Sequence, residues 1–169
     1  GVMVPMVETA AQARQLVQWA KYPPVGTRSY SGGAHTGYGP SGHHAQNMSR
    51  ANVSTLAIAH IETVEGVRNV RDILAVPGLE AAIVGPCDLA ISMGRPDEVG
   101  CHEELALIDE VQAACAAAGK GFGIIGGNAL LAMYVGNINL MVSAIDTHIL
   151  RDALAGAASE YQKIRAQAK

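Results

Sequence analysis

The chain of 169 residues carries 12 basic and 15 acidic side chains, and 49% of its residues are hydrophobic, values typical of a folded globular domain. A net charge of −3 without a cluster of Lys or Arg argues against a surface for nucleic acid, because binding to phosphates requires concentrated positive charge. No run approaches the roughly 20 apolar residues of a membrane span, and the first residues lack the basic flank of a signal peptide.

The cysteine and aromatic contents narrow the class further. Cys87, Cys101 and Cys115 are odd in number and show no CxxC spacing, so neither a disulfide framework nor a zinc knuckle is indicated. We therefore expect a reducing, cytoplasmic setting. The 4% of aromatic residues leaves few platforms on which bases could stack.

The chain opens with a strand followed by a helix. Residues 2–7 are apolar and predict a buried strand. The helix that starts after Thr9 has apolar residues at helical spacing, namely Ala13, Leu16, Val17 and Ala20. The Pro- and Gly-containing segment 22–26 breaks this helix, and residues 29–47, which are polar and rich in Gly and His, predict a loop.

A second and a third strand follow in the middle of the chain. Residues 55–61 are apolar, and the next helix carries Val67, Val70, Ile73 and Leu74 on one face. The Pro-Gly pair at 77–78 ends that helix. Residues 79–84 predict the third strand, and 87–94 predict a turn or a short helix.

The last part of the chain repeats the same unit. A long helix is predicted from about residue 103 to 118, with Gly119 at its C-cap. Strands at 122–125 and 140–145 alternate with helices that begin after Asn128 and run over about 147–166.

Five short apolar strands that alternate with helices predict an α/β fold built from parallel units. A complete (β/α)₈ barrel needs eight such units and typically about 250 residues, so a single domain over 1–169 has room for about five of the eight strands of a TIM barrel, and the pattern alone does not choose between this partial barrel and a whole small domain. A complete five-stranded doubly wound sheet fits the same count. No GxGxxG follows the first strand and no GxxxxGK[ST] occurs, so the dinucleotide and P-loop versions of that sheet have no support.

Two carboxylates follow neighbouring strands, where parallel α/β folds gather their reactive groups. Glu62 ends the second strand and Asp88 follows the third. Adjacent strands lie about 4.8 Å apart, so both carboxylates can reach one cation, and oxygen ligands suit Mg²⁺ or Mn²⁺. Each acid taken alone is equally explained as a helix N-cap. His60 stands two residues before Glu62 on the same face of the strand, where it either donates to a substrate oxygen or is an ordinary buried histidine.

Other polar residues have simpler interpretations. Asp146 and Thr147 predict the cap of the last helix. The histidines of the Gly-rich loop are more typical of solvated side chains than of a site: His35, His43 and His44. Cys87 has no evident base beside it, which favours a contribution from its backbone over a nucleophilic thiol. None of the lysines follows a strand, so a Schiff-base mechanism is not indicated; they are Lys21, Lys120, Lys163 and Lys169.

Four motifs occur together in one order: Val4-Pro5-Met6-Val7, Tyr22-Pro23-Pro24-Val25-Gly26-Thr27-Arg28, His60-Ile61-Glu62-Thr63 and Gly85-Pro86-Cys87-Asp88-Leu89. With these motifs the chain resembles the HpcH/HpaI aldolase/citrate lyase family, and within it the class II pyruvate aldolases. The resemblance implies that Glu62 and Asp88 bind the metal and that Pro86 and Cys87 flank the pyruvate carboxylate. His60 stands where the family commonly has a glutamine that contacts the pyruvate oxygen, and Cys87 replaces a small residue, usually alanine.

The resemblance implies a carbon–carbon lyase that cleaves a 4-hydroxy-2-oxo acid to pyruvate and an aldehyde with Mg²⁺ or Mn²⁺, or Co²⁺. A CoA-ester lyase of the citrate or malyl-CoA type and an oxaloacetate decarboxylase remain alternatives on the same site. Members of the family begin with three βα units that supply a catalytic histidine and a pyruvate-binding arginine, and no part of this sequence matches those units. We therefore also consider a catalytically incomplete domain. The expected partners are a small 2-oxo acid and further copies of the chain in a homo-oligomer, with neither nucleic acid nor membrane.

Overall fold

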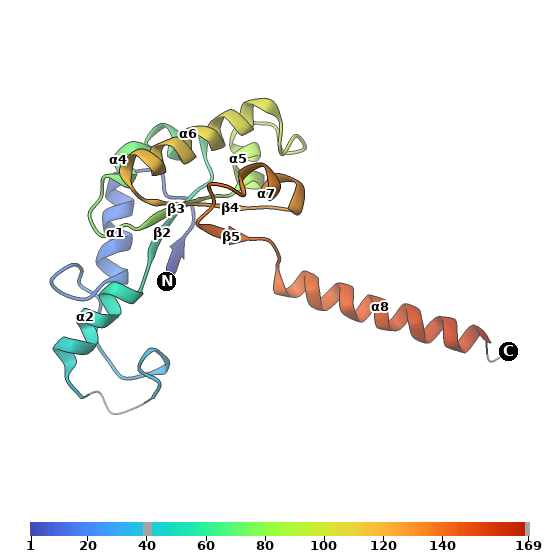
Figure 1. The fold of residues 1–169 in the computed structure, drawn as a ribbon, viewed down its shortest axis with the longest axis horizontal. Coiled ribbons are helices and arrows are strands. Elements are labelled where there is room, and N and C mark those ends of the chain that lie inside the picture. The colour runs from blue at the N-terminus through green and yellow to red at the C-terminus, as the bar shows by residue number, and fades with distance from the viewer. Residues whose placement is uncertain (39–41, 168–169) are drawn as a thin grey trace.

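Five parallel strands form one sheet in the computed structural model, which describes residues 1–38 and 42–167. The strands lie in chain order, so each connection steps to the next neighbour and the sheet curls into a half-barrel (Figure 1). A doubly wound sheet would instead reverse its strand order at a switch point. The partial barrel predicted from the sequence is therefore confirmed. The strands are β1 (Val2–Val4), β2 (Ala57–Ile61), β3 (Ala81–Val84), β4 (Gly121–Ile125) and β5 (Leu140–Val142).

Helices connect the strands and cover the core. They are α1 (Ala10–Ala20), the 3₁₀ turn η1 (Ala34–Thr36), α2 (His44–Ser54), α3 (Val64–Arg68), α4 (Val70–Leu74), α5 (Pro86–Ser92), α6 (His102–Ala118), α7 (Asn128–Tyr134) and α8 (Asp146–Gln167). The apolar face predicted for α1 is buried, as is the face predicted for the segment 64–74. These faces pack with the interior residues of β2, β3 and β4 in one hydrophobic core.

Local signals account for several helix ends. Thr9 and Gln12 form a capping box at the start of α1, each side chain bonding to the backbone of the other. Pro86 occupies the first turn of α5, where its missing N–H costs nothing. Gly119 ends α6 in the left-handed conformation with φ 63°, as its position in the sequence predicted.

Four predicted strands are too long, two of them because they begin two residues early, at 55 and 79, and two because they end late. The first ends at Val4 because Pro5 cannot donate a backbone hydrogen bond and Met6 adopts a left-handed conformation with φ 55°. The last ends at Val142 and not at residue 145. The helix predicted through Val67 and Leu74 is interrupted at Asn69, which separates α3 from α4.

The predicted loop 29–47 is also partly wrong. It contains η1, and α2 begins inside it at His44. Residues 39–41 of this prediction lie outside the described residues. The helix α2 buries none of its residues, so it lacks the apolar stripe by which a helix is recognised in a sequence.

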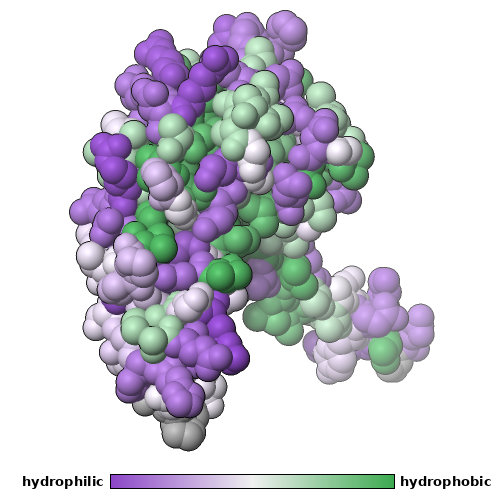
Figure 2. All heavy atoms as spheres, turned by 60° about the vertical axis from the view of Figure 1, so that its left-hand side comes forward, coloured by the Kyte–Doolittle hydropathy of each residue, from purple (hydrophilic) through white to green (hydrophobic). Residues whose placement is uncertain are grey.

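The helix α8, like α2, has no buried residue. It projects away from the body of the molecule, and hydrophobic side chains gather where the two meet (Figures 1 and 2). None of the helices in the described part of the chain combines the length and hydropathy needed to cross a membrane.

Candidate active site

The carboxyl ends of β2 and β3 bring the predicted acidic residues to one edge of the sheet. The two strands pair in parallel with Ile61 opposite Val84, so Glu62 and the first turn of α5 follow at the same level. Glu62 is only 4% exposed, whereas Asp88, in that first turn, is exposed to solvent. One buried and one accessible carboxylate therefore lie at this rim.

The carboxylate of Glu62 is held by the backbone of a distant residue. Its Oε1 accepts a hydrogen bond from the N–H of Met6 at 2.8 Å, and its Oε2 lies 3.2 Å from Nε2 of His60. Met6 adopts a left-handed conformation that is uncommon for residues other than glycine, and such conformations cluster at functional sites. The turn after β1 thus fixes one oxygen of Glu62 and leaves the other facing His60.

His60 and Glu62 are adjacent in space, as their spacing along β2 predicted. Burial lowers the pKa of His60, against the opposing effect of the Glu62 and Asp88 carboxylates, so the neutral imidazole is favoured near pH 7. Despite its proximity to Glu62, Nε2 of His60 has no hydrogen-bond partner among the described residues. A buried polar atom without a partner is unusual in a protein and is consistent with a position kept for a ligand.

The absence of a side chain at Gly85 leaves space for the side chains of His60 and Glu62. A Cβ atom at position 85 would lie 2.4 Å from His60 Nε2 and 2.8 Å from Glu62 Oε2, well inside van der Waals contact. Its backbone N–H bonds to the carbonyl oxygen of Ile61 at 3.2 Å, which fixes the end of β3 against β2. Glycine is therefore required here by a close approach of side chains.

The donor set fits a hard divalent cation. Glu62 has no Lys or Arg partner among the described residues, so its buried charge lacks a counter-ion. No group of three or more His, Cys, Asp and Glu residues suited to a metal occurs in the parts of the chain that the structure describes. A pair of carboxylates with the remaining positions filled by water or substrate is the arrangement that Mg²⁺ commonly uses.

The start of α5 supplies the two other predicted residues. Pro86 is buried and Cys87 is exposed, and both stand in the first turn of the helix beside Asp88. The first-turn N–H groups of Cys87 and Asp88 have no acceptor within a helix, which leaves them available to an anionic group. Their position is compatible with contact to a substrate carboxylate through the backbone.

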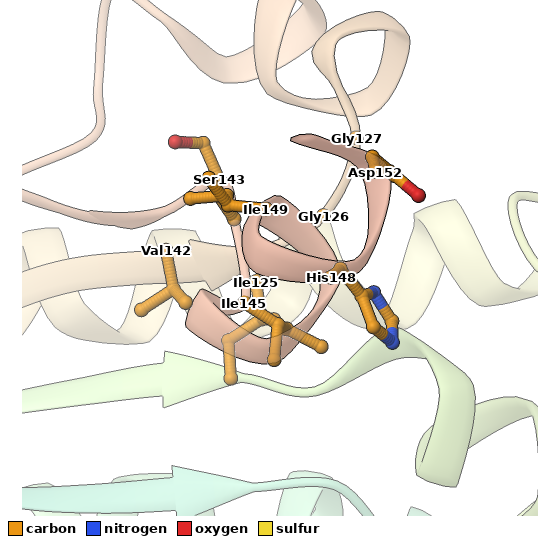
Figure 3. A pocket seen from close by; sticks show the side chains of 10 residues that line it. Ile125, Gly126, Gly127, Val142, Ser143, Ile145, His148, Ile149 and Asp152 are labelled. Carbon is orange, nitrogen blue, oxygen red and sulfur yellow. The ribbon is translucent and has the colours of Figure 1, made fainter. Parts of the chain in front are cut away.

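A cavity of about 370 Å³ continues the rim beyond the ends of β4 and β5. Figure 3 shows mostly aliphatic lining, with His148 and Asp152 from the first turns of α8. The sequence pattern singled out neither residue, because both lie on α8 beyond the strand ends. It also missed the role of Met6, for which the sequence carries no signal.

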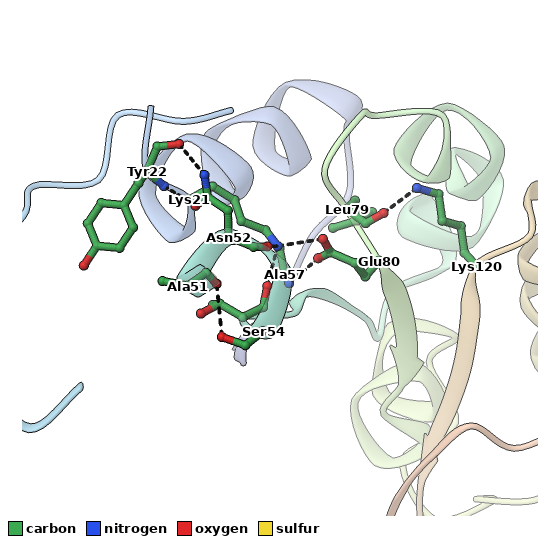
Figure 4. A network of polar contacts seen from close by, with 10 residues as sticks. Lys21, Tyr22, Ala51, Asn52, Ser54, Ala57, Leu79, Glu80 and Lys120 are labelled. Carbon is green, nitrogen blue, oxygen red and sulfur yellow. Dashed lines mark hydrogen bonds and ion pairs between the residues drawn. The ribbon is translucent and has the colours of Figure 1, made fainter. Parts of the chain in front are cut away.

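The lysines lie away from this rim. Lys21 is buried at the amino end of the sheet, where its Nζ donates to the carbonyl oxygens of Asn52 and Thr55 and lies 2.6 Å from Glu80 Oε1 (Figure 4). Nζ of Lys120 donates to the carbonyl oxygen of Leu79 at the same end. Lys163 lies on the exposed helix α8, and Lys169 is outside the described residues.

The remaining polar residues are structural or lie elsewhere. Asp146 begins α8, and its Oδ1 accepts a hydrogen bond from the N–H of Thr147 at 2.7 Å. An N-cap side chain would accept from the second or third amide beyond it, so the capping role of Asp146 and Thr147 stays a prediction. His43 and His44 lie at the start of α2, where the ring of His44 contacts Tyr30. His35 belongs to η1.

A curled parallel sheet with carboxylates at its carboxyl rim defines the class of barrel-type α/β proteins that place their sites on strand ends. The family model described as HpcH/HpaI aldolase/citrate lyase matches residues 1–131. The chain belongs to this family, and the resemblance found in the sequence motifs is confirmed.

Individual relatives agree with this assignment. A 2-keto-3-deoxy-L-rhamnonate aldolase from Salmonella paratyphi B is 30% identical over 167 residues, which cover 97% of this chain and 62% of the relative. The crystal structure of an HpcH/HpaI aldolase from Desulfitobacterium hafniense DCB-2 superposes with a TM-score of 0.84 at 27% identity, over 95% of this chain and 62% of that one. The chain thus spans somewhat less than two thirds of the length of these relatives.

A more distant structure shares the fold. The citrate lyase beta subunit from M. tuberculosis, complexed with oxaloacetate and magnesium, has a TM-score of 0.54 at 17% identity and covers 85% of this chain and 55% of its own length. At that identity the likeness concerns the architecture of the chain alone.

Proposed function

We propose that this chain carries the metal-binding part of a class II aldolase that cleaves a 4-hydroxy-2-oxo acid to pyruvate and an aldehyde. The observation that carries the proposal is the buried Glu62 carboxylate, which lacks a counter-ion and lies beside the unpartnered Nε2 of His60. Family membership and the 2-keto-3-deoxy-L-rhamnonate aldolase relative support the reaction class.

In this proposal Glu62 and Asp88 hold the divalent cation, Mg²⁺ or Mn²⁺, with Co²⁺ as a further candidate. When bound, the cation supplies Lewis-acid stabilisation of the negative charge that develops on the 2-oxo group as the C3–C4 bond breaks. The N–H of Met6 orients Glu62 by occupying its Oε1. The buried position of Glu62 excludes water from that side of the site.

His60 and the start of α5 bind the substrate. A neutral His60 can present an N–H to the 2-oxo oxygen, since its Nε2 has no other partner among the described residues. The N–H groups of Cys87 and Asp88 are suited to the carboxylate of the 2-oxo acid, and Pro86 fixes the turn that presents them. Together these contacts would hold the 2-oxo acid at the carboxyl ends of β2 and β3.

The experiment is deuterium exchange at C3 of pyruvate with added Mg²⁺ or Mn²⁺, followed by NMR. We expect Glu62→Ala and Asp88→Ala each to abolish the exchange. The matched controls are Glu65→Ala and Asp72→Ala, exposed acids on α3 and α4. Exchange that survives both site substitutions would contradict the assignment.

A catalytically incomplete domain is distinguished by measuring Mn²⁺ binding directly. If Mn²⁺ binds the parent chain, is lost in Glu62→Ala and Asp88→Ala, and no exchange occurs, the metal site is present but the catalytic set is incomplete. Cleavage assays with citrate, malyl-CoA and oxaloacetate separate the lyase and decarboxylase alternatives, which share the same rim.

We also expect the chain to associate into a homo-oligomer. The strands β1 and β5 are the two edges of the sheet, and each pairs with one neighbour only among the described residues. Met3 on β1 and Met141 on β5 are exposed. Unpaired edges of this kind favour association, so sedimentation should report more than one copy.

A further inference from the structure

A second cavity, of about 320 Å³, lies between α2 and the segment that follows α1. Its lining is mostly polar and includes Tyr22, Tyr30, Thr36, Asn47, Arg50 and Ser54. The helix α2 leads into the amino end of β2, whereas the candidate active site follows the carboxyl end of that strand. The cavity and the rim therefore belong to opposite ends of the sheet, and the lobe that carries α2 is largely hydrophilic in Figure 2.

Two phenol hydroxyl groups of this cavity can donate to a bound group. Tyr22 is 1% exposed, and its hydroxyl has no hydrogen-bond partner among the described residues. Its ring is turned away from the Lys21–Glu80 contacts in Figure 4. The hydroxyl of Tyr30 accepts from Nδ2 of Asn47 at 3.2 Å, which leaves its own proton to donate.

The Thr and Ser hydroxyl groups that line the cavity already donate hydrogen bonds to the backbone. Thr36 Oγ1 donates to the carbonyl oxygen of Gly33 at 2.8 Å, and Ser54 Oγ donates to that of Ala51 at 3.4 Å. The buried Tyr22 hydroxyl is thus a donor without an acceptor among the described residues, and leaving such a donor unpaired has a cost in stability. An acceptor placed in the cavity would remove that cost.

The cavity also has positive charge without a counter-ion. Arg50 lines it and forms no ion pair in the described part of the chain. The guanidinium carbon of Arg28 lies 4.7 Å from the centroid of the Tyr22 ring. No acidic residue occurs between Glu8 and Glu62, although the chain as a whole has a net charge of −3.

We propose that this cavity is a binding site for a small oxyanion, a phosphate or carboxylate group held by the Arg50 guanidinium and the hydroxyl groups of Tyr22 and Tyr30. Arginine suits such groups because its planar fork can donate two parallel hydrogen bonds. The bound anion would also join α2 to the segment after α1. The two are already joined by the side chain of Asn52, which accepts from the N–H of Tyr22 at 2.7 Å and donates to its carbonyl oxygen at 2.9 Å, and by the contacts of Lys21.

The test is calorimetric titration of the chain, freed of divalent cations, with inorganic phosphate and separately with acetate. Saturable binding of either anion is expected, and it should weaken as NaCl is added because an exposed guanidinium is screened by salt. Phosphate binding alone would indicate a phosphoryl ligand, and acetate binding would indicate a carboxylate.

Substitutions locate the bound anion. We expect Tyr22→Phe and Arg50→Gln each to weaken binding about tenfold, the value of one hydrogen bond to a charged group. Tyr161→Phe and Arg71→Gln, exposed residues on α8 and α4, should bind as the parent does. Glu62→Gln should also bind the anion unchanged, which keeps this site separate from the proposed metal site.

A stability measurement guards against variants that fold poorly. Without the anion, Tyr22→Phe should melt at or above the temperature of the parent, because it removes an unpaired buried hydroxyl. Phosphate should raise the melting temperature of the parent more than that of Tyr22→Phe. The proposal is overturned if neither anion binds saturably, if Tyr22→Phe and Arg50→Gln bind as the parent does, or if Glu62→Gln abolishes binding.

Discussion

Two buried charged groups at opposite ends of the same sheet differ in how completely they are paired. At the amino end, Nζ of Lys21 has three acceptors: the carbonyl oxygens of Asn52 and Thr55 and the carboxylate of Glu80. At the carboxyl end, Glu62 has one firm hydrogen bond among the described residues, from Met6, and its neighbour is His60, whose neutral form is favoured by burial. The complete pairing of Lys21 indicates a structural role, and the incomplete pairing of Glu62 indicates a role in binding a ligand.

The largest expected effect concerns the amino end. Lys21→Met should lower the free energy of unfolding by about 3 kcal/mol, since it removes the partner of Glu80 and all three hydrogen bonds. Mn²⁺ binding to the folded protein should stay unchanged. Urea unfolding of this variant is compared with that of Lys163→Met, since the ammonium of Lys163 is exposed on α8 and pairs with Glu160 alone among the described residues. If Lys21→Met instead lost affinity for Mn²⁺ and kept its stability, the assignment of a structural role to the amino end and a binding role to the carboxyl end would be wrong.

The next effect concerns the space at the rim. Gly85→Ala should weaken Mn²⁺ binding by about 10–100-fold, because the new methyl group would displace His60 and Glu62. Overpacking of this kind should also cost about 1–3 kcal/mol of stability. Gly127→Ala is the matched control. Gly127 follows β4, and a Cβ atom at this position would meet nothing within 4 Å. Equal Mn²⁺ affinity in the two variants would show that the space beside Gly85 is not needed for His60 and Glu62 to support metal binding.

A smaller effect is expected from the turn that holds Glu62. Met6→Val should cost about 1 kcal/mol, because a β-branched residue disfavours the left-handed conformation, and it should weaken Mn²⁺ binding a few-fold. Met6→Asn should keep both properties near the parent values, since asparagine tolerates that conformation. The side chain of Met6 is half-exposed, so neither change removes core packing. If both variants behaved alike, the backbone conformation would have no role in positioning Glu62.

The smallest effect is a difference in thiol reactivity. Burial raises the pKa of Cys115 to about 11, so its thiol stays protonated at pH 8 and should resist iodoacetamide in the folded protein. Cys87 is exposed at the rim and should be alkylated first, which mass spectrometry of peptides can follow. Pyruvate together with Mn²⁺ should slow the reaction at Cys87. Modification of Cys115 at an equal rate would indicate that the core opens readily.

The contacts of the candidate site were only partly predictable. The pattern along β2 placed His60 and Glu62 on one face, and the structure brings them to 3.2 Å. The hydrogen bond from Met6 joins residues 56 positions apart, and the close approach at Gly85 depends on the packing of β3 against β2. Neither has a local signal, because both arise only when separate strands are placed side by side.

The sequence by itself determined the alternation of strands and helices, the acidic residues at two strand ends and the motifs of the family. These features follow from local periodicity, chain breakers and residue identity. Only the tertiary structure decided between a half-barrel and a doubly wound sheet, because both use the same units and differ in strand order. It also decided which buried charges are satisfied, since Lys21 finds its acceptors and Glu62 its single firm donor in segments remote along the chain.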